Sequence, residues 1–138
     1  MKHQSIQCTS EELESRRLLS GSAVLSADGT WTITGTSASD QIKILRPSNG
    51  PRFQADVNDT RFLVDVASVK HIIINAGEGN DTVNVADNNY NSKPFGKGVA
   101  INGQGGSDKI RGGPNSDTIH GGDGNDTIIG LAGNDQLR

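Results

Sequence analysis

The chain is poor in the residues that stabilise most compact domains. Only 32% of its 138 residues are hydrophobic and only 4% are aromatic, which excludes a core built of large side chains. Its single cysteine, Cys8, excludes an internal disulfide framework and a cysteine-based zinc site. No stretch approaches the roughly 20 apolar residues that a transmembrane helix needs. The formal charge of -3, without a basic stripe, argues against a nucleic-acid partner.

Glycine is present in excess, and its positions are periodic. Ten of the 18 glycines lie in residues 103–138, which read in nines as GQGGSDKIR, GGPNSDTIH, GGDGNDTII and GLAGNDQLR. Glycine holds position 1, aspartate position 6, and Ile or Leu position 8. These columns are Gly103, Gly112, Gly121 and Gly130; Asp108, Asp117, Asp126 and Asp135; and Ile110, Ile119, Ile128 and Leu137. A fixed period of this kind predicts a repeat protein.

The same pattern extends towards the N-terminus. Residues 76–84, AGEGNDTVN, place Asp81 in the acidic column three nonapeptides before the corresponding aspartate of residues 103–111. The intervening residues 85–102 keep the phase but lack the glycines and the acid. Tyr90 and Val99 stand where the acidic residue would be. We therefore expect the nonapeptide register to run unbroken through this gap.

Each nonapeptide divides into a strand and a turn. The last three residues form a short strand with an aliphatic side chain pointing inward, and GGxGxD reverses the chain where only glycine adopts positive φ freely. If two nonapeptides make one coil, turns 18 residues apart stack at about 4.8 Å. Asp108 would then lie over Asp126 and Asp117 over Asp135, with Asp81 on the second of these edges. Stacked carboxylates repel unless a cation lies between them, and calcium is the cation that suits carboxylates mixed with backbone carbonyls.

The nonapeptide GGDGNDTII at 121–129 matches the pattern GGxGxDxUx at every specified position. The chain thus resembles the hemolysin-type (RTX) calcium-binding repeat family. The resemblance implies an all-β fold with a parallel β-roll, and Ca²⁺ as the bound ion. Gln104, Asn115 and Leu131 depart from the pattern by replacing glycine. The candidate metal-site residues are Asp81, Asp108, Asp117, Asp126, Asp135, Gly103, Gly105, Gly112, Gly121, Gly122, Gly124 and Gly130.

The sequence divides into three parts. Residues 1–20 contain a short helical segment at 9–20, TSEELESRRLLS, which resembles the LE-x-R-x-LLS segment near the start of large exported bacterial proteins with such repeats. Residues 21–75 are expected to form an antiparallel β cap, and residues 76–138 the calcium-binding roll. Within the cap, Asp28-Gly29 is a strong hairpin signal. The expected core residues of the cap are Trp31, Ile33, Ile42, Ile44, Phe53, Phe62 and Val64.

One further echo of the repeat lies inside the predicted cap. GTSASDQIK at 35–43 has Asp40 and Ile42 at the right spacing, but it is out of phase with the nonapeptides. We therefore expect Asp40 to be a turn residue rather than a calcium ligand.

The resemblance implies a secreted or surface module with a structural or adhesive role that folds on binding calcium, and we expect this module to be non-catalytic. No Ser, His and Asp residues are spaced as a catalytic set, so the chain is not expected to be an enzyme. One alternative is an accessory module of a larger secreted protease, lipase or polysaccharide-modifying enzyme. Another is a carbohydrate-binding module that uses exposed Trp31, Tyr90 and Phe95. The last strand, with Leu137, is expected to pair with further repeats or a second copy of the chain, and a cell-surface or polysaccharide partner is a further expectation.

Overall fold

The computed structural model describes residues 21–46, 50–85 and 96–138. The predicted helical segment at 9–20, Cys8, Tyr90 and Phe95 lie outside these residues. No helix in the described ranges is long and apolar enough to cross a membrane.

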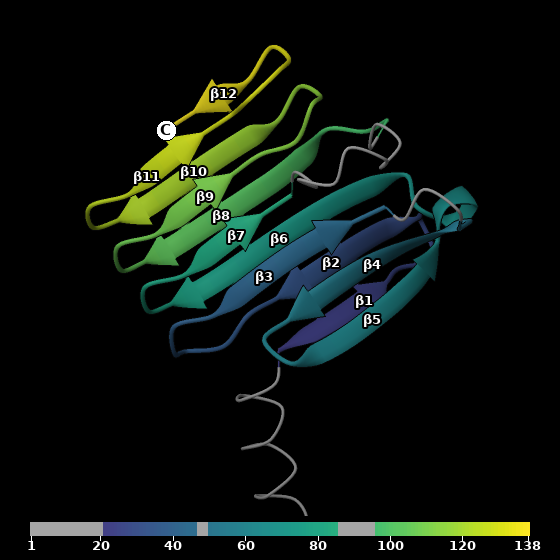
Figure 1. Ribbon diagram of the computed structural model, residues 1–138, viewed down its shortest axis with the longest axis horizontal. Coiled ribbons are helices and arrows are strands. Elements are labelled where there is room, and N and C mark those ends of the chain that lie inside the picture. Colours follow the sequence, from purple (N-terminus) through teal and green to yellow (C-terminus); the bar gives the residue numbers. More distant parts are fainter. Residues whose placement is uncertain (1–20, 47–49, 86–95) are drawn as a thin grey trace, which may run out of the picture.

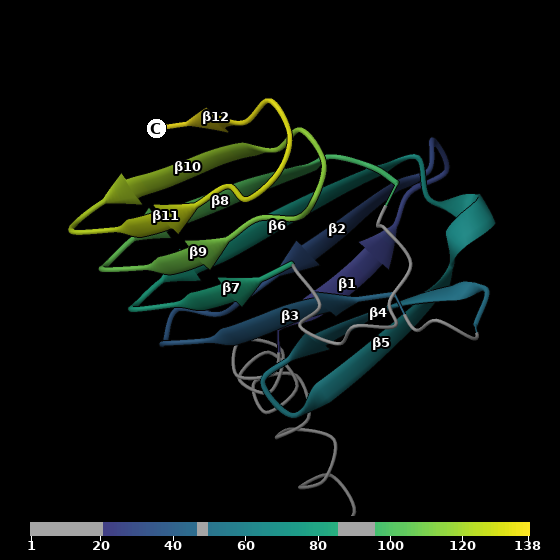
Figure 2. The same ribbon diagram turned by 45° about the horizontal axis from the view of Figure 1, so that its top comes forward.

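Two six-stranded sheets form the protein and lie face to face as two layers (Figures 1 and 2). The first sheet contains, in spatial order, β1 (Ser22–Leu25), β2 (Thr30–Thr34), β6 (His71–Glu78), β8 (Val99–Gly105), β10 (Thr118–Asp123) and β12 (Gln136–Leu137). The second contains β11 (Thr127–Ile129), β9 (Lys109–Arg111), β7 (Thr82–Asn84), β3 (Gln41–Leu45), β4 (Arg52–Val57) and β5 (Thr60–Asp65). A single 3-10 turn, Val66–Ser68, is the one helical element among the described residues.

The chain alternates between the sheets, so that one strand from each makes a coil of a parallel β-roll. The four complete coils are β2–β3, β6–β7, β8–β9 and β10–β11, and every contact between successive coils is parallel. β8 and β10 pair Ile101 with Ile119, the 18-residue step that two nonapeptides require. The predicted all-β roll is confirmed.

Antiparallel strands are confined to the N-terminal end of the roll. β1 pairs with β2 across the Asp28-Gly29 turn, as predicted, and β3, β4 and β5 form an antiparallel meander. However, β2 and β3 also pair in parallel with β6 and β7. Residues 21–75 therefore hold the first coil of the roll as well as the antiparallel strands, and the three-part division of the chain stays a prediction.

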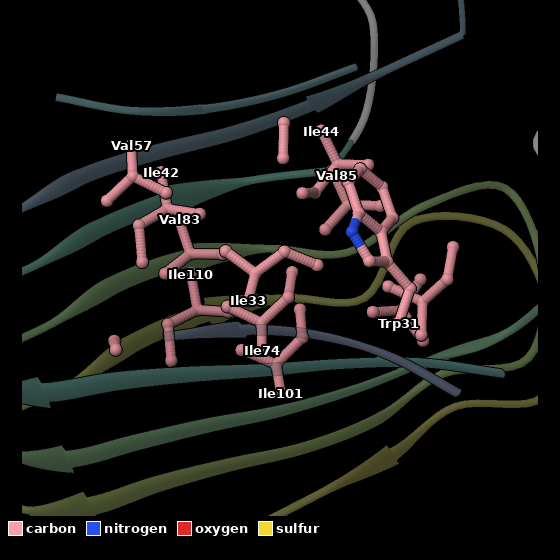
Figure 3. Close-up of a cluster of buried hydrophobic side chains, with 14 of the residues drawn as sticks. Trp31, Ile33, Ile42, Ile44, Val57, Ile74, Val83, Val85, Ile101 and Ile110 are labelled. Carbon is pink, nitrogen blue, oxygen red and sulfur yellow. The ribbon is translucent and has the colours of Figure 1, made fainter. Parts of the chain in front are cut away.

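The core is a ladder of aliphatic side chains between the sheets. Ile33, Ile74 and Ile101 stack along the first sheet and face a matching column from the second, Ile42, Val83 and Ile110 (Figure 3). All six side chains are buried, because every second residue of a strand points inward. Position 8 of the nonapeptide thus supplies the core, as predicted.

Among the described residues, the aromatic side chains of the core lie in or beside the first coil. The rings of Trp31 and Phe53 stack with their centroids 6.4 Å apart. All the core residues predicted for this region are buried except Phe62 and Val64, which are partly buried against the same cluster. Trp31 is 2% exposed, so the expectation that it stacks on a sugar is wrong.

Candidate metal centre

The turns between the sheets lie along two edges of the roll. The first edge consists of the turns that lead from the first sheet to the second, at the left of Figure 1: 35–40, 76–81, 103–108 and 121–126. The second edge carries the return connections, among them the regular turns 112–117 and 130–135. Position 6 of each of these six turns is an aspartate: Asp40, Asp81, Asp108, Asp126, Asp117 and Asp135.

Hydrogen bonds fix the aspartates of the first edge in one column. The backbone N–H of Asp40 donates to Oδ1 of Asp81 at 2.8 Å, and the N–H of Asp81 donates to Oδ1 of Asp108 at 2.8 Å. The N–H of Asp108 donates to Oδ1 of Asp126 at 2.9 Å. Each carboxylate thus bridges to the coil before it through one oxygen.

The second edge repeats this arrangement. The N–H of Val99 donates to Oδ1 of Asp117 at 2.8 Å, and the N–H of Asp117 donates to Oδ1 of Asp135 at 2.9 Å. The predicted pairs Asp108/Asp126 and Asp117/Asp135, and the position of Val99 in the acidic column, therefore agree with the structure.

The position predicted for Asp81 is wrong. Its neighbour is Asp108, 27 residues away, rather than the Asp117 column of the opposite edge. Arg111 and Thr118, on either side of the return turn 112–117, are seven positions apart, whereas their partners Asn84 and Ala100 are 16 positions apart, one nonapeptide more. Because one nonapeptide is half a coil, one extra nonapeptide keeps the phase of the sequence but moves the next turn to the opposite edge. The register therefore does not run through the gap as a regular coil.

Asp40 lies in a turn, as expected, and that turn belongs to the roll. Asp40 joins the same column as Asp81, at a separation of 41 residues, and Gln41 pairs with Thr82 in the strands that follow. The β4–β5 hairpin inserted between the first two coils shifts the sequence phase without disturbing the coil. The out-of-phase echo GTSASD is therefore a turn of the same column.

A second ladder, at position 5 of the turns, runs in the opposite direction. The N–H of Asn80 donates to Oγ of Ser39 at 3.0 Å, and the N–H of Ser107 donates to Oδ1 of Asn80 at 2.8 Å. Here each side chain accepts from the following coil, whereas each aspartate accepts from the preceding one. The two ladders together hold successive turns in register.

Glycine makes this close stacking of turns sterically feasible. Gly122 and Gly124 have φ values of 96° and 119°, and a Cβ on either would collide with the carbonyl oxygen of Gln104 or Gly106 in the preceding turn. At position 1, a Cβ would collide with the aspartate side chain of the same turn, for instance that of Asp126 at Gly121. The same close contact with their own aspartate occurs at Gly103, Gly112 and Gly130.

One further acidic side chain approaches the first edge. The carboxylate of Glu78, at position 3 of its turn, lies beside Gly105 of the next coil, where a Cβ would collide with it. Sequence analysis did not select Glu78, because position 3 is variable in the nonapeptide pattern. Its charge adds to those of Asp81 and Asp108.

The buried carboxylates are electrostatically unfavourable. Asp81 and Asp108 are each 1% exposed, and in each the buried Oδ2 has no hydrogen-bond partner among the described residues. Burial, followed by repulsion from Asp108, Asp40 and Glu78, raises the pKa of Asp81 to about 6, against the opposing hydrogen bond from the N–H of Asp40. Burial and the charge of Asp126 likewise raise the pKa of Asp108.

This arrangement fits a hard cation with oxygen ligands. In the described residues no three His, Cys, Asp or Glu side chains form a group that could hold a metal ion. Carboxylates from neighbouring turns together with backbone carbonyls would give the mixture of ligands that calcium accepts. The buried Oδ2 atoms of Asp81 and Asp108 have no hydrogen-bond partner among the described residues. A bound cation would supply that missing partner.

Comparison with known proteins agrees with this geometry. The RTX calcium-binding nonapeptide repeat, in four copies, matches residues 73–89 and 102–137. No curated protein and no solved structure gave a significant match. The two matched segments are thus similar to RTX calcium-binding repeats, which bind Ca²⁺. The repeat family is a structural calcium-binding module typical of exported bacterial proteins.

Proposed function

We propose that the chain holds calcium ions between successive turns of the first edge and uses them to complete its fold. The observation that carries the proposal is the pair of buried Oδ2 atoms of Asp81 and Asp108, which lie in adjacent coils and have no hydrogen-bond partner in the part of the chain that the structure describes. The proposed metal-binding residues on this edge are Asp81, Asp108 and Asp126 with the carbonyls of their turns. Asp135 on the second edge is a further proposed ligand.

The proposed biological role is a structural or adhesive module that acts outside the cell. Sites in extracellular modules bind calcium at about 10⁻⁴–10⁻³ M, so they would be empty in the cytosol and filled after export. The chain would then be loosely folded before export and rigid afterwards. This role rests on the calcium sites and on the typical occurrence of such repeats in exported proteins.

We propose that the module itself is non-catalytic, because its acidic columns are explained by the stacking of turns. An accessory role beside a secreted enzyme remains compatible with the same calcium-dependent fold. The carbohydrate-binding alternative loses its main support, since Trp31 is buried.

Calcium titration tests the proposal. Thermal unfolding in EDTA should be compared with unfolding in millimolar calcium and in equal magnesium. An ion that binds only the folded state stabilises it by about 1.4 kcal/mol per site at ten times its Kd. The melting temperature should therefore rise with calcium and change little with magnesium, which demands a tighter octahedral site. Identical melting curves in EDTA and calcium would refute the proposed function.

A further inference from the structure

The six turns fall into two conformational classes at position 2. In four of them this residue has a positive φ: Gly77 (107°), Gln104 (80°), Gly122 (96°) and Leu131 (76°). In the other two, 35–40 and 112–117, the corresponding residues Thr36 and Gly113 lie outside the left-handed region. We call the first four turns open and the other two closed.

In the closed turns the aspartate is satisfied by its own turn. The N–H of Gly113 donates to Oδ2 of Asp117 at 2.6 Å, while Oδ1 of Asp117 accepts from Val99 at 2.8 Å. The N–H of Thr36 likewise donates to Oδ2 of Asp40 at 2.6 Å. Both oxygens of Asp117 are therefore engaged by backbone donors.

The first closed turn adds side-chain donors. Oδ1 of Asp40 accepts from the hydroxyl of Thr36 at 2.9 Å and from the amide of Asn58, in the β4–β5 turn, at 2.8 Å. Asn58 is itself fixed to the first coil, because its Oδ1 accepts from the N–H of Gln41 at 2.9 Å. The hairpin thus supplies a donor at the place where the next cation of the column would bind.

The open turns leave their aspartates incomplete. Oδ2 of Asp81 and of Asp108 has no hydrogen-bond partner among the described residues, although both atoms are buried. A positive φ at position 2 turns the N–H of that residue away from the carboxylate. The carboxylate then has one oxygen in the ladder and one oxygen available to a cation.

The sequence explains why these turns close. Gly113 precedes Pro114, and a residue before proline is held in the extended region. Asn115 also replaces the glycine that has a positive φ at position 4 of the open turns, such as Gly124. In the first turn, Ala38 takes the place of this position-4 glycine, and Thr36 at position 2 is β-branched, which disfavours a positive φ more strongly than an unbranched Cβ does.

Taking calcium binding by the roll as proposed above, we propose that calcium binds only at open turns and that Asp117 and Asp40 are structural carboxylates rather than ligands. Each closed turn gives its aspartate protein donors in place of an ion, because hydrogen bonds to a carboxylate stabilise its charge. At Asp117, burial still raises the pKa against the hydrogen bonds from Val99 and Gly113. Two adjacent pairs of open turns exist in the described residues, 76–81 with 103–108 and 103–108 with 121–126. Calcium is therefore concentrated on the first edge.

Asp108→Asn and Asp117→Asn form a matched pair for the test. Both aspartates are 1% exposed and both accept a backbone N–H of the preceding coil through Oδ1. Calorimetric titration of the chain with calcium should show at least a tenfold loss of affinity for Asp108→Asn. The affinity and stoichiometry of Asp117→Asn should match the parent chain within about twofold. In EDTA the melting temperature should rise for Asp108→Asn and fall for Asp117→Asn, because the Nδ2 that replaces Oδ2 in the latter would oppose the N–H of Gly113.

A gain-of-site variant tests the same inference without depending on the stability of Asp117→Asn. Pro114→Asp combined with Asn115→Gly converts the turn to GGDGSD, which should open it and add one calcium ion per chain. Unchanged stoichiometry in this variant, or equal losses of affinity in Asp108→Asn and Asp117→Asn, would overturn the inference and leave calcium binding by the parent intact. A parent chain that binds no calcium would instead remove the proposed function itself.

Discussion

Replacing Asp81 with asparagine should stabilise the chain in calcium-free buffer, and calcium should cancel that advantage. The carboxylate is buried, carries a free oxygen and has a pKa of about 6 instead of 3.8. The difference corresponds to about 3 kcal/mol that the ionised form costs the fold at pH 7. The asparagine side chain would keep the Oδ1 acceptor for the N–H of Asp40 and lose the charge. We expect Asp81→Asn to be about 1–3 kcal/mol more stable than the parent in calcium-free buffer at pH 7.

Calcium should cancel this advantage of the variant. The parent gains the binding free energy of the ion that Asp81 helps to hold, about 2.7 kcal/mol for one site at a hundred times its Kd. The Asp81→Asn variant forfeits much of that gain, since a charged ligand has been removed, but it keeps the site between turns 103–108 and 121–126. Its stability should therefore rise less than that of the parent between calcium-free and calcium-saturated buffer.

The pH dependence follows from the same pKa. Because the pKa of Asp81 is raised in the folded state, the penalty is complete above pH 6 and is relieved as the pH falls from about 6 to about 4. The calcium-free parent should thus gain stability over this interval, and Asp81→Asn should show a shallower gain because Asp108 still contributes.

Urea unfolding followed by circular dichroism and by the fluorescence of the single, buried Trp31 measures these differences. Calcium-free buffers must be prepared by resin treatment, since EDTA loses affinity for calcium in acid. An Asp81→Asn variant that is less stable than the parent without calcium at pH 7 would refute the argument from the buried charge.

Three further predictions concern packing and association. Gly124→Ala should cost more than about 2 kcal/mol in urea unfolding, because φ is 119° and the Cβ would collide with Gly106. Gly50→Ala, whose Cβ would make only an ordinary contact with the backbone of Arg52, should stay within about 0.5 kcal/mol. Ile101→Ala should cost about 2–5 kcal/mol, since Ile101 is fully buried, and Leu137→Ala, at 47% exposure, should cost far less; equal losses would contradict the aliphatic ladder. β11 and β12 each pair with one strand only among the described residues, so we expect calcium-dependent self-association, which sedimentation velocity with and without calcium would detect or exclude.

The coil itself could be predicted from the sequence because its causes are local. A three-residue strand with an inward aliphatic residue, followed by a glycine-rich reversal, repeats through residues 103–138 and determines both the core column and the acidic column. The structure agrees there, with Ile101 over Ile119 and Asp108 over Asp126. The Asp28-Gly29 hairpin was equally local, and β1 and β2 pair around it.

The edge on which a turn lies could not be predicted in the same way. One nonapeptide is half a coil, so turns on the two edges have the same phase in the nine-residue period of the sequence. An insertion of nine residues therefore leaves this period unchanged and cannot be detected from it. Only the pairing of β7 with β9 reveals that Asp81 belongs with Asp108. Conversely, the β4–β5 hairpin shifts the phase while leaving Asp40 in its column. The period of the sequence identifies the repeating unit of a solenoid, whereas the pairing of strands shows which units are neighbours.

The means of stabilisation therefore change along the roll. The first coil packs Trp31 on Phe53, is covered by the antiparallel strands and completes Asp40 with protein donors. The later coils have a column of single aliphatic side chains, and in the fourth even Ile128 is only partly buried. The first-edge turns of these later coils are open, and no cationic side chain is seen to pair with their aspartates among the described ion pairs. Along the roll, the amount of buried apolar surface falls while the acidic charge of the turns remains. Calcium should therefore contribute least to the stability of the first coil and most to that of the later coils. We expect the first coil to fold without calcium and to serve as the template on which the calcium-dependent coils fold.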